Sequence, residues 1–127
     1  MDPNLLLWIG QIVLALAFLG AGNTHALGFE RASVRPHRTW MADVGRDNLR
    51  IIGILEILGA IGLILPAATR VLPWLTPVAA TALAVLMVFA VVFHLRRSRE
   101  GSNAVFNAVL GLLAAAVAYG RFVVAPL

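Results

Sequence analysis

The chain has 127 residues, of which 61% are hydrophobic and 13% are charged, with a formal net charge of +4. Soluble domains carry about 25% charged residues, so this composition excludes an ordinary soluble protein. The absence of cysteine excludes disulfide exchange and thiolate-ligated clusters on the chain itself. The basic residues are all arginines that lie between apolar stretches, so we interpret them as topology signals and expect no nucleic-acid partner.

Four apolar stretches are long enough to span a lipid bilayer. About 20 apolar residues, at about 1.5 Å rise per residue, cross the roughly 30 Å hydrocarbon core. The sequence therefore predicts an all-α protein, an integral membrane four-helix up-and-down bundle, with residues 1–127 as a single membrane domain. We expect helices at approximately 5–28, 49–68, 74–96 and 103–124, and a cytoplasmic connection over 29–48.

The first expected helix begins with "MDPNLLLW", which is acidic rather than basic and therefore favours a retained span over a cleaved secretory signal. Gln11 and His25 lie on one helical stripe, together with Phe18 and Gly22, because these spacings return to nearly the same face. Asn23 lies beside His25 in the chain and can extend the polar group at that end of the helix.

The connection over 29–48 is longer than a turn needs. We expect it to contain a short interfacial helix after Pro36, with Trp40 and Met41 in the lipid head-group region. This connection and the loop over 96–102 hold most of the arginines. The positive-inside rule then places both loops in the cytoplasm and both termini outside.

The second expected helix contains the segment "RIIGILEILGAIGLILP", residues 50–66, whose apolar part is interrupted by one carboxylate, Glu56. Gly53, Gly59 and Ala60 lie on the same helical face as Glu56, about one turn away. Small residues allow helices to approach closely in lipid, so this face is expected to point into the bundle. Ionisable residues within membrane spans are functional by default, which makes Glu56 the principal candidate residue.

The third and fourth expected helices add two more polar groups to the same half of the bundle. His94 lies just inside the cytoplasmic end of the third helix, and Asn107 lies about one turn into the fourth. Arg121, near the end of the fourth helix, is expected to snorkel to the outer surface. The candidate acid/base groups are Glu56 and His94. The candidate ligand-binding groups are His25, Asn107, Asn23 and Gln11.

These residues support several chemistries. Glu56 facing either His94 or His25 would form an acid/base pair or a proton relay. His25, His94 and Glu56 could also hold a zinc or iron ion, but no tight ligand spacing supports this. The two histidines could instead ligate a haem iron, but the glycine-rich faces only hint at the wide apolar slot that haem needs. We expect neither group. Alternatively, Glu56 is protonated and only hydrogen-bonds neighbouring helices.

The motifs "LAFLGAG", "RIIGILEILGAIGLILP", "LTPVAATALAVLMVFAVVFHLRR" and "YGRF" follow one another over nearly the whole chain. In this order they resemble the DoxX-like family of small four-helix bacterial membrane proteins. The resemblance implies recurring polar positions at Glu56, His94, Arg96 and Arg121, and for some members it implies quinone-linked redox chemistry or membrane-complex assembly. The chain departs from the family at "GNTHAL", where His25 stands in place of a frequent lysine.

We therefore expect an inner-membrane protein whose polar site binds a lipophilic small molecule, with a quinone as one candidate. One alternative is a redox-neutral isomerase, cyclase or hydrolase that acts on a lipid or terpenoid with the same groups. The other is a non-enzymatic subunit or assembly factor in which these groups only specify packing. The small-residue faces also allow a homo-oligomer or a partner membrane or redox protein.

Overall fold

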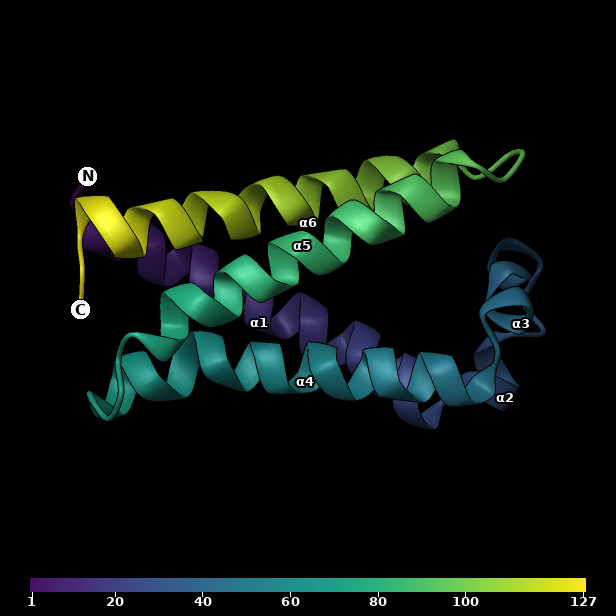
Figure 1. Ribbon diagram of the computed structural model, residues 1–127, viewed down its shortest axis with the longest axis horizontal. Helices are drawn as coiled ribbons and strands as arrows, with labels where there is room; N and C mark the ends of the chain where they lie inside the picture. Colours follow the sequence, from purple (N-terminus) through teal and green to yellow (C-terminus); the bar gives the residue numbers. More distant parts are fainter.

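The computed structural model describes all 127 residues, and the chain is an all-α up-and-down bundle, as predicted (Figure 1). A π-helical segment, η2, continues the last of the long helices. Each of the four spans, with η2 included in the last, is long and apolar enough to cross a membrane. The bounds are α1 Pro3–Leu27, α4 Arg46–Thr69, α5 Leu75–Leu95, α6 Gly101–Tyr119 and η2 Gly120–Val124.

Three short helical segments connect α1 to α4: α2 (Phe29–Ala32), the 3-10 helix η1 (Pro36–Arg38) and α3 (Trp40–Val44). They lie at the same end of the bundle as the α5–α6 connection, and we call this the loop end (Figure 1). Both chain termini lie at the opposite end, which we call the terminal end.

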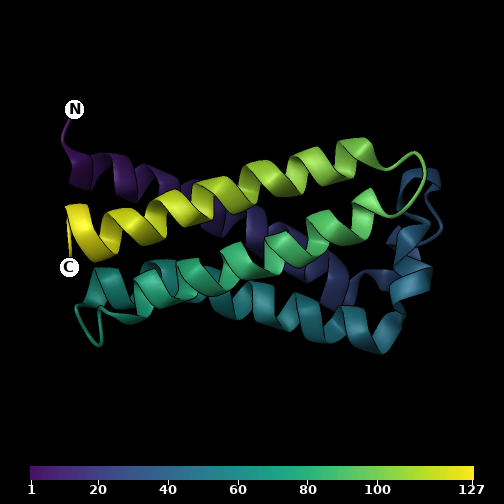
Figure 2. The same cartoon turned by 45° about the horizontal axis from the view of Figure 1, so that its top comes forward.

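The bundle consists of two helix pairs that separate toward the loop end. Helix α1 packs along α4 and α5 packs along α6, whereas α1 meets α6 over a shorter stretch. Figure 2 shows the two pairs diverging toward the connection that carries α2 and α3. One buried hydrophobic cluster joins all four helices, and its larger members are Leu14, Phe18, Leu63, Leu83, Met87, Leu110 and Val117. The divergence leaves room for a cavity at the loop end.

The close contact between α1 and α4 depends on two glycines. A Cβ atom built on Gly53 would lie 2.6 Å from both the Gly22 carbonyl oxygen and the Ala26 nitrogen. A Cβ atom on Gly22 would lie 2.7 Å from the Gly53 carbonyl oxygen. Any side chain at either position would push the two backbones apart. The small-residue face predicted around Glu56 is therefore a helix-packing face.

The outward faces of the long helices carry large apolar side chains. Leu16, Leu58, Phe89 and Leu112, one from each helix, are 67%, 58%, 69% and 72% exposed. Apolar surface of this extent on every helix is unfavourable in water but suited to hydrocarbon. The environment that fits these faces is a lipid bilayer.

The connection differs from the expectation at two side chains. Met41 is fully buried against Ala32 and Leu49, and the half-buried Trp40 packs against His25 and His94. Both were expected in the head-group region. They turn inward because α3 folds over the loop end, where burial removes their apolar surface from water. The next helix, α4, begins at Arg46 rather than at residue 49, directly after Gly45, whose φ of 92° suits glycine.

Candidate functional site

Glu56 is buried at the contact between α1 and α4, where it pairs with His25. The carboxylate is 2% exposed, and its Oε1 atom lies 2.5 Å from the His25 Nδ1 atom. Gly22 and Gly53 precede these two residues by one helical turn, so the close helix contact described above brings the two side chains together. A proton can reside on either member, and the hydrogen bond is satisfied in both states.

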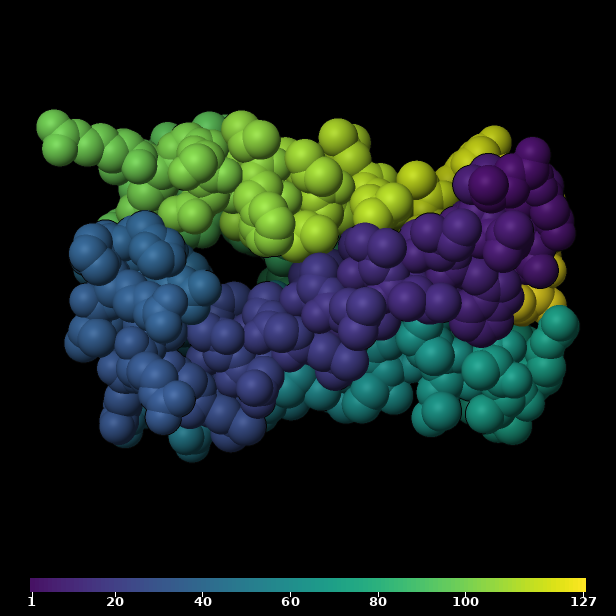
Figure 3. Space-filling view, turned by 180° about the vertical axis from the view of Figure 1, so that it is seen from behind, coloured from purple at the N-terminus to yellow at the C-terminus, as the bar shows by residue number.

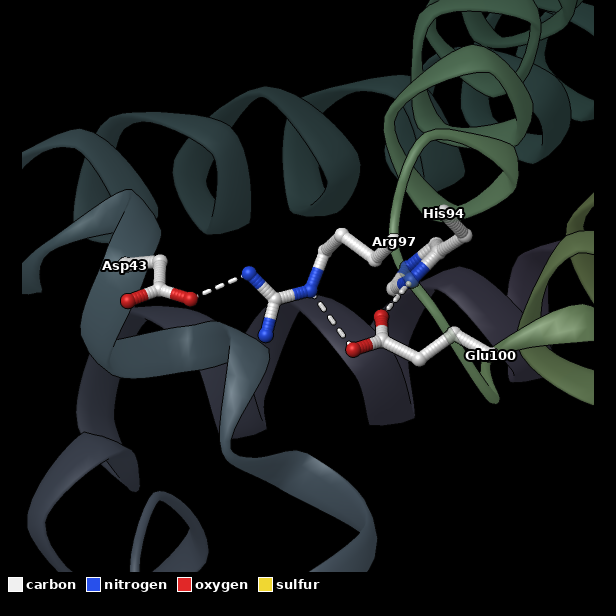
Figure 4. Close-up of polar contacts among 4 residues, drawn as sticks. All are labelled: Asp43, His94, Arg97 and Glu100. Atoms are coloured by element: carbon white, nitrogen blue, oxygen red, sulfur yellow. Dashed lines mark hydrogen bonds and ion pairs between the residues drawn. The ribbon is translucent and has the colours of Figure 1, made fainter.

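His94 pairs with a different carboxylate, Glu100, which lies in the connection between α5 and α6. The His94 Nδ1 atom lies 2.7 Å from Glu100 Oε1, and Arg97 Nε donates to Glu100 Oε2 at 2.6 Å. Arg97 also donates to Asp43 on α3, so the network joins the α5–α6 connection to the connection between α1 and α4 (Figure 4). The two candidate histidines, His25 and His94, thus both have carboxylate partners on their Nδ1 atoms.

In the α5–α6 connection, the pKa values of Glu100 and Arg97 follow from burial and from hydrogen bonds within this network. Burial by itself would raise the pKa of Glu100, but hydrogen bonds from Arg97 and His94 outweigh burial and lower this pKa below its usual range. Hydrogen bonds to Glu100 and then Asp43 raise the pKa of the Arg97 guanidinium. Glu100 is therefore ionised at neutral pH and connects His94 electrostatically to Arg97.

Trp40 contacts both histidines. Its ring centroid lies 5.7 Å from that of His25 and 5.0 Å from that of His94, with nearly perpendicular planes. Phe93 packs edge-on against both Trp40 and His94. Edge-to-face packing stabilises aromatic pairs beyond what the burial of their surface contributes, and its preferred geometry orients the imidazoles.

These groups line a cavity of about 800 Å³ at the loop end, between the diverging helix pairs. Its wall is mainly apolar and contains Glu56, His25 and His94. Asn107 also lies in the wall. Seen from the side of α1, the surface is hollowed between α1, the connection that follows it and α6 (Figure 3). The cavity therefore brings together four of the six candidate residues, one from each long helix.

The two remaining candidates lie elsewhere. Gln11 is fully buried nearer the terminal end, where its Nε2 atom donates to the Leu63 carbonyl oxygen at 2.6 Å. Its Oε1 atom accepts from Arg121 Nε at 2.6 Å. Asn23 is exposed and lines a different hollow at the loop end. Neither residue lines the cavity that contains Glu56.

Arg121 does not snorkel to the surface as expected. It is 2% exposed and donates through Nη1 to Asn4 Oδ1 at 2.7 Å, in addition to its bond with Gln11. Its guanidinium also lies 5.6 Å from the centroid of the Trp8 ring. Neutral acceptors and an aromatic face thus hold the cation inside the bundle and join α1 to η2.

Two contributors to the site were missed by sequence reasoning. Glu100 follows His94 by six residues across the end of a helix, and the chain reversal between α5 and α6 returns its carboxylate to the histidine. A carboxylate shortly after a helix-terminal histidine could have suggested this pair. Trp40 was assigned to the interface from its residue type, and no local pattern indicates that it turns inward. No group of three histidine, aspartate or glutamate side chains is arranged to hold a metal ion.

The fold and the lipid-facing surface define a small multi-pass membrane protein with a polar group inside the bundle. The chain belongs to the DoxX-like family, whose sequence model matches residues 9–117. No curated protein and no solved structure matches the chain. The match includes all four residues of the cavity wall that were predicted from the sequence.

Proposed function

We propose that the protein binds a lipophilic small molecule in the cavity at the loop end and exchanges a proton with it through the His25–Glu56 pair. The observation that carries this proposal is a buried carboxylate paired with a half-buried imidazole in the wall of a mainly apolar cavity of about 800 Å³. Small-molecule sites typically have volumes of about 300–1,000 Å³ and a few polar groups in an apolar wall.

The proposed roles of the two histidines depend on which of their ring nitrogens already bind protein groups. His25 and His94 each use Nδ1 for a carboxylate, and no protein atom hydrogen-bonds the Nε2 atom of either ring. Those Nε2 atoms are available to a polar ligand group. We assign proton exchange to Glu56 with His25, and orientation of the ligand to His94 and Asn107.

A quinone is the first ligand to test. Its ring oxygens accept hydrogen bonds from imidazole or carboxylic acid donors, and an isoprenoid tail can pass between α1 and α6. Reduction to the quinol takes up two protons through the site. A partner redox protein would supply the two electrons. Redox-neutral acid/base chemistry on a lipid or terpenoid would use the same residues, and the identity of the retained molecule separates the two chemistries.

The binding experiment compares two phenylalanine variants. Gly20 lines the cavity, and a Cβ atom there meets no other atom within 4 Å, so Gly20→Phe fills space without displacing backbone. Ala115→Phe is the control, because Ala115 is exposed on α6 and lines neither hollow. Protein in nanodiscs is analysed by native mass spectrometry and by extraction of its small molecules. Wild type and Ala115→Phe should retain one molecule that Gly20→Phe loses. Equal retention by all three would overturn the proposal.

The proton-exchange role is tested at Glu56. Glu56→Gln keeps a hydrogen-bonding group beside His25 but cannot ionise, so the pH dependence of short-chain quinone affinity should change while the fold is retained. Glu56→Leu leaves His25 Nδ1 without its partner and should lower the free energy of unfolding by about 1–3 kcal/mol. Unchanged pH dependence in Glu56→Gln, with instability only in Glu56→Leu, would instead support a purely structural subunit or assembly factor.

We also propose a bacterial inner-membrane location with the loop end in the cytoplasm and both termini outside. Eight of the ten arginines lie in the connections at the loop end or within the first five residues of α4, and this asymmetry supports the orientation. Since the chain has no cysteine, a single introduced cysteine is a unique label. In intact cells a membrane-impermeant maleimide should label Asp2→Cys and not Ser98→Cys. The reverse pattern would contradict this orientation.

A further inference from the structure

A second hollow, of about 870 Å³, lies at the loop end between the end of α1, the segment with α2 and η1, and the beginning of α4. Its wall is mainly polar, and the only carboxylate in it is Glu30. Thr24 and Arg38 lie in the walls of both this hollow and the cavity described above, so the two spaces are neighbours. The basic residues that line the second hollow are Arg31, Arg35, Arg38, Arg46 and Arg50.

Most of the positive charge around this hollow has no partner in the protein. Arg46 pairs with Glu30 and also lies over the Phe29 ring. The other four arginines form no ion pair. Arg50 reaches only a carbonyl oxygen, that of Ala26, at a long 3.4 Å. Like charges gathered around one hollow repel one another, and a bound anion removes this repulsion.

The geometry of a guanidinium group suits it to binding phosphate. Each offers a planar fork of N–H donors that can bind two phosphate oxygens at once. Asn23 and Thr24 add neutral polar groups to the same wall. Because four guanidinium groups lack a carboxylate, one phosphodiester charge would leave most of them uncompensated. The arrangement therefore favours an anion with at least two phosphate charges.

The surroundings favour a lipid over a soluble phosphate. Leu27 lies in the wall of the hollow and is 78% exposed. Ile51 follows the lining residue Arg50 and is 58% exposed. Apolar side chains beside a basic hollow provide a surface for acyl chains next to the head group, and basic pockets beside membrane spans recognise anionic lipid head groups. We propose that this arginine hollow binds the head group of a lipid that carries two phosphate charges.

The test is native mass spectrometry of the purified protein in a neutral detergent, titrated with cardiolipin, phosphatidylglycerol or phosphatidylcholine. Cardiolipin should bind at least about tenfold more tightly than phosphatidylcholine. The double variant Arg35→Gln/Arg38→Gln should lower cardiolipin affinity by about 30-fold. The control Arg96→Gln/Arg99→Gln removes the same charge at the loop end but outside the hollow, and should lose less than about threefold.

Three results would overturn the proposal. They are equal loss of affinity in both double variants, no preference for cardiolipin over phosphatidylglycerol or phosphatidylcholine, and displacement of bound cardiolipin by inorganic pyrophosphate. The last result would show recognition of soluble phosphates. Circular dichroism checks that each variant is folded. Arg35 is exposed, so the single variant Arg35→Gln keeps the test valid if the double variant does not fold, with an expected loss of about fivefold. Arg35 lines this hollow but not the His25–Glu56 cavity, so the outcome for Arg35→Gln does not depend on the ligand of that cavity.

Discussion

Substituting alanine for Gly53 tests whether the close contact of α1 with α4 supports the bundle and positions Glu56. The added Cβ atom would lie 2.6 Å from Gly22 O and from Ala26 N, and both of these are backbone atoms. Non-bonded heavy atoms are most stable about 3.5–4.0 Å apart, so the two helices must separate by about 1 Å. Such a shift would also lengthen the contact between Glu56 and His25.

The expected magnitude comes from a comparison with Gly20→Ala. Overpacking at a well-packed contact costs about 1–3 kcal/mol. Alanine is also about 0.5–1 kcal/mol more favourable than glycine within a helix, and this gain applies to both variants. A Cβ atom at Gly20 meets no atom within 4 Å. Gly53→Ala should therefore have a free energy of unfolding about 1–3 kcal/mol below that of Gly20→Ala.

The assay is reversible unfolding in mixed micelles of a mild detergent with increasing dodecyl sulfate, followed by circular dichroism. The same preparations are examined for the small molecule retained in the cavity. Gly53→Ala should combine lower stability with reduced retention, because the helix separation disturbs the cavity wall. Equal stability of Gly53→Ala and Gly20→Ala would refute the reasoning, since the backbones would then not be held in contact at that point.

Three further predictions concern individual side chains. The pKa of Glu100 is lowered in the folded protein, so its stabilising effect is present above its ordinary value of 4.5 and is lost as the pH falls through the lowered value. Glu100→Gln should reduce the pH dependence of the free energy of unfolding in that acidic range. An unchanged pH dependence would contradict the hydrogen bonds assigned to Glu100. Gln11→Leu removes the acceptor of Arg121 Nε and should cost about 1–3 kcal/mol in unfolding while ligand retention is unchanged; reduced retention would place Gln11 at the ligand after all. Met41→Ala should cost about 2–5 kcal/mol, because the side chain is fully buried; a cost below 1 kcal/mol would show that α3 is not packed as described.

Glu56 could be located from local spacing, but its partner could not. Glycine and alanine one turn on either side predict that the carboxylate faces inward, and the structure buries it there. Whether it meets His25 or His94 depends on the rotation and depth of three helices. The sequence left both pairings open, and the structure selects His25.

The residues between the helices were the least predictable part of the site. Trp40 and Met41 have the composition of an interfacial segment, yet α3 folds over the loop end and buries Met41. Glu100 lies in a charged turn, where a solvent-exposed position is the usual expectation. Its pairing with His94 arises from the reversal of the chain between α5 and α6.

The sequence by itself determined the number of spans, the all-α class and the inward face around Glu56, because hydrophobic length and helical periodicity are properties of contiguous residues. Only the tertiary structure decided which polar groups meet. His25 and Glu56 are 31 positions apart in the chain, and Gln11 and Arg121 are 110 positions apart. Such contacts depend on how the helices pack, and here the glycine contact of α1 with α4 and the divergence of the two helix pairs determine them.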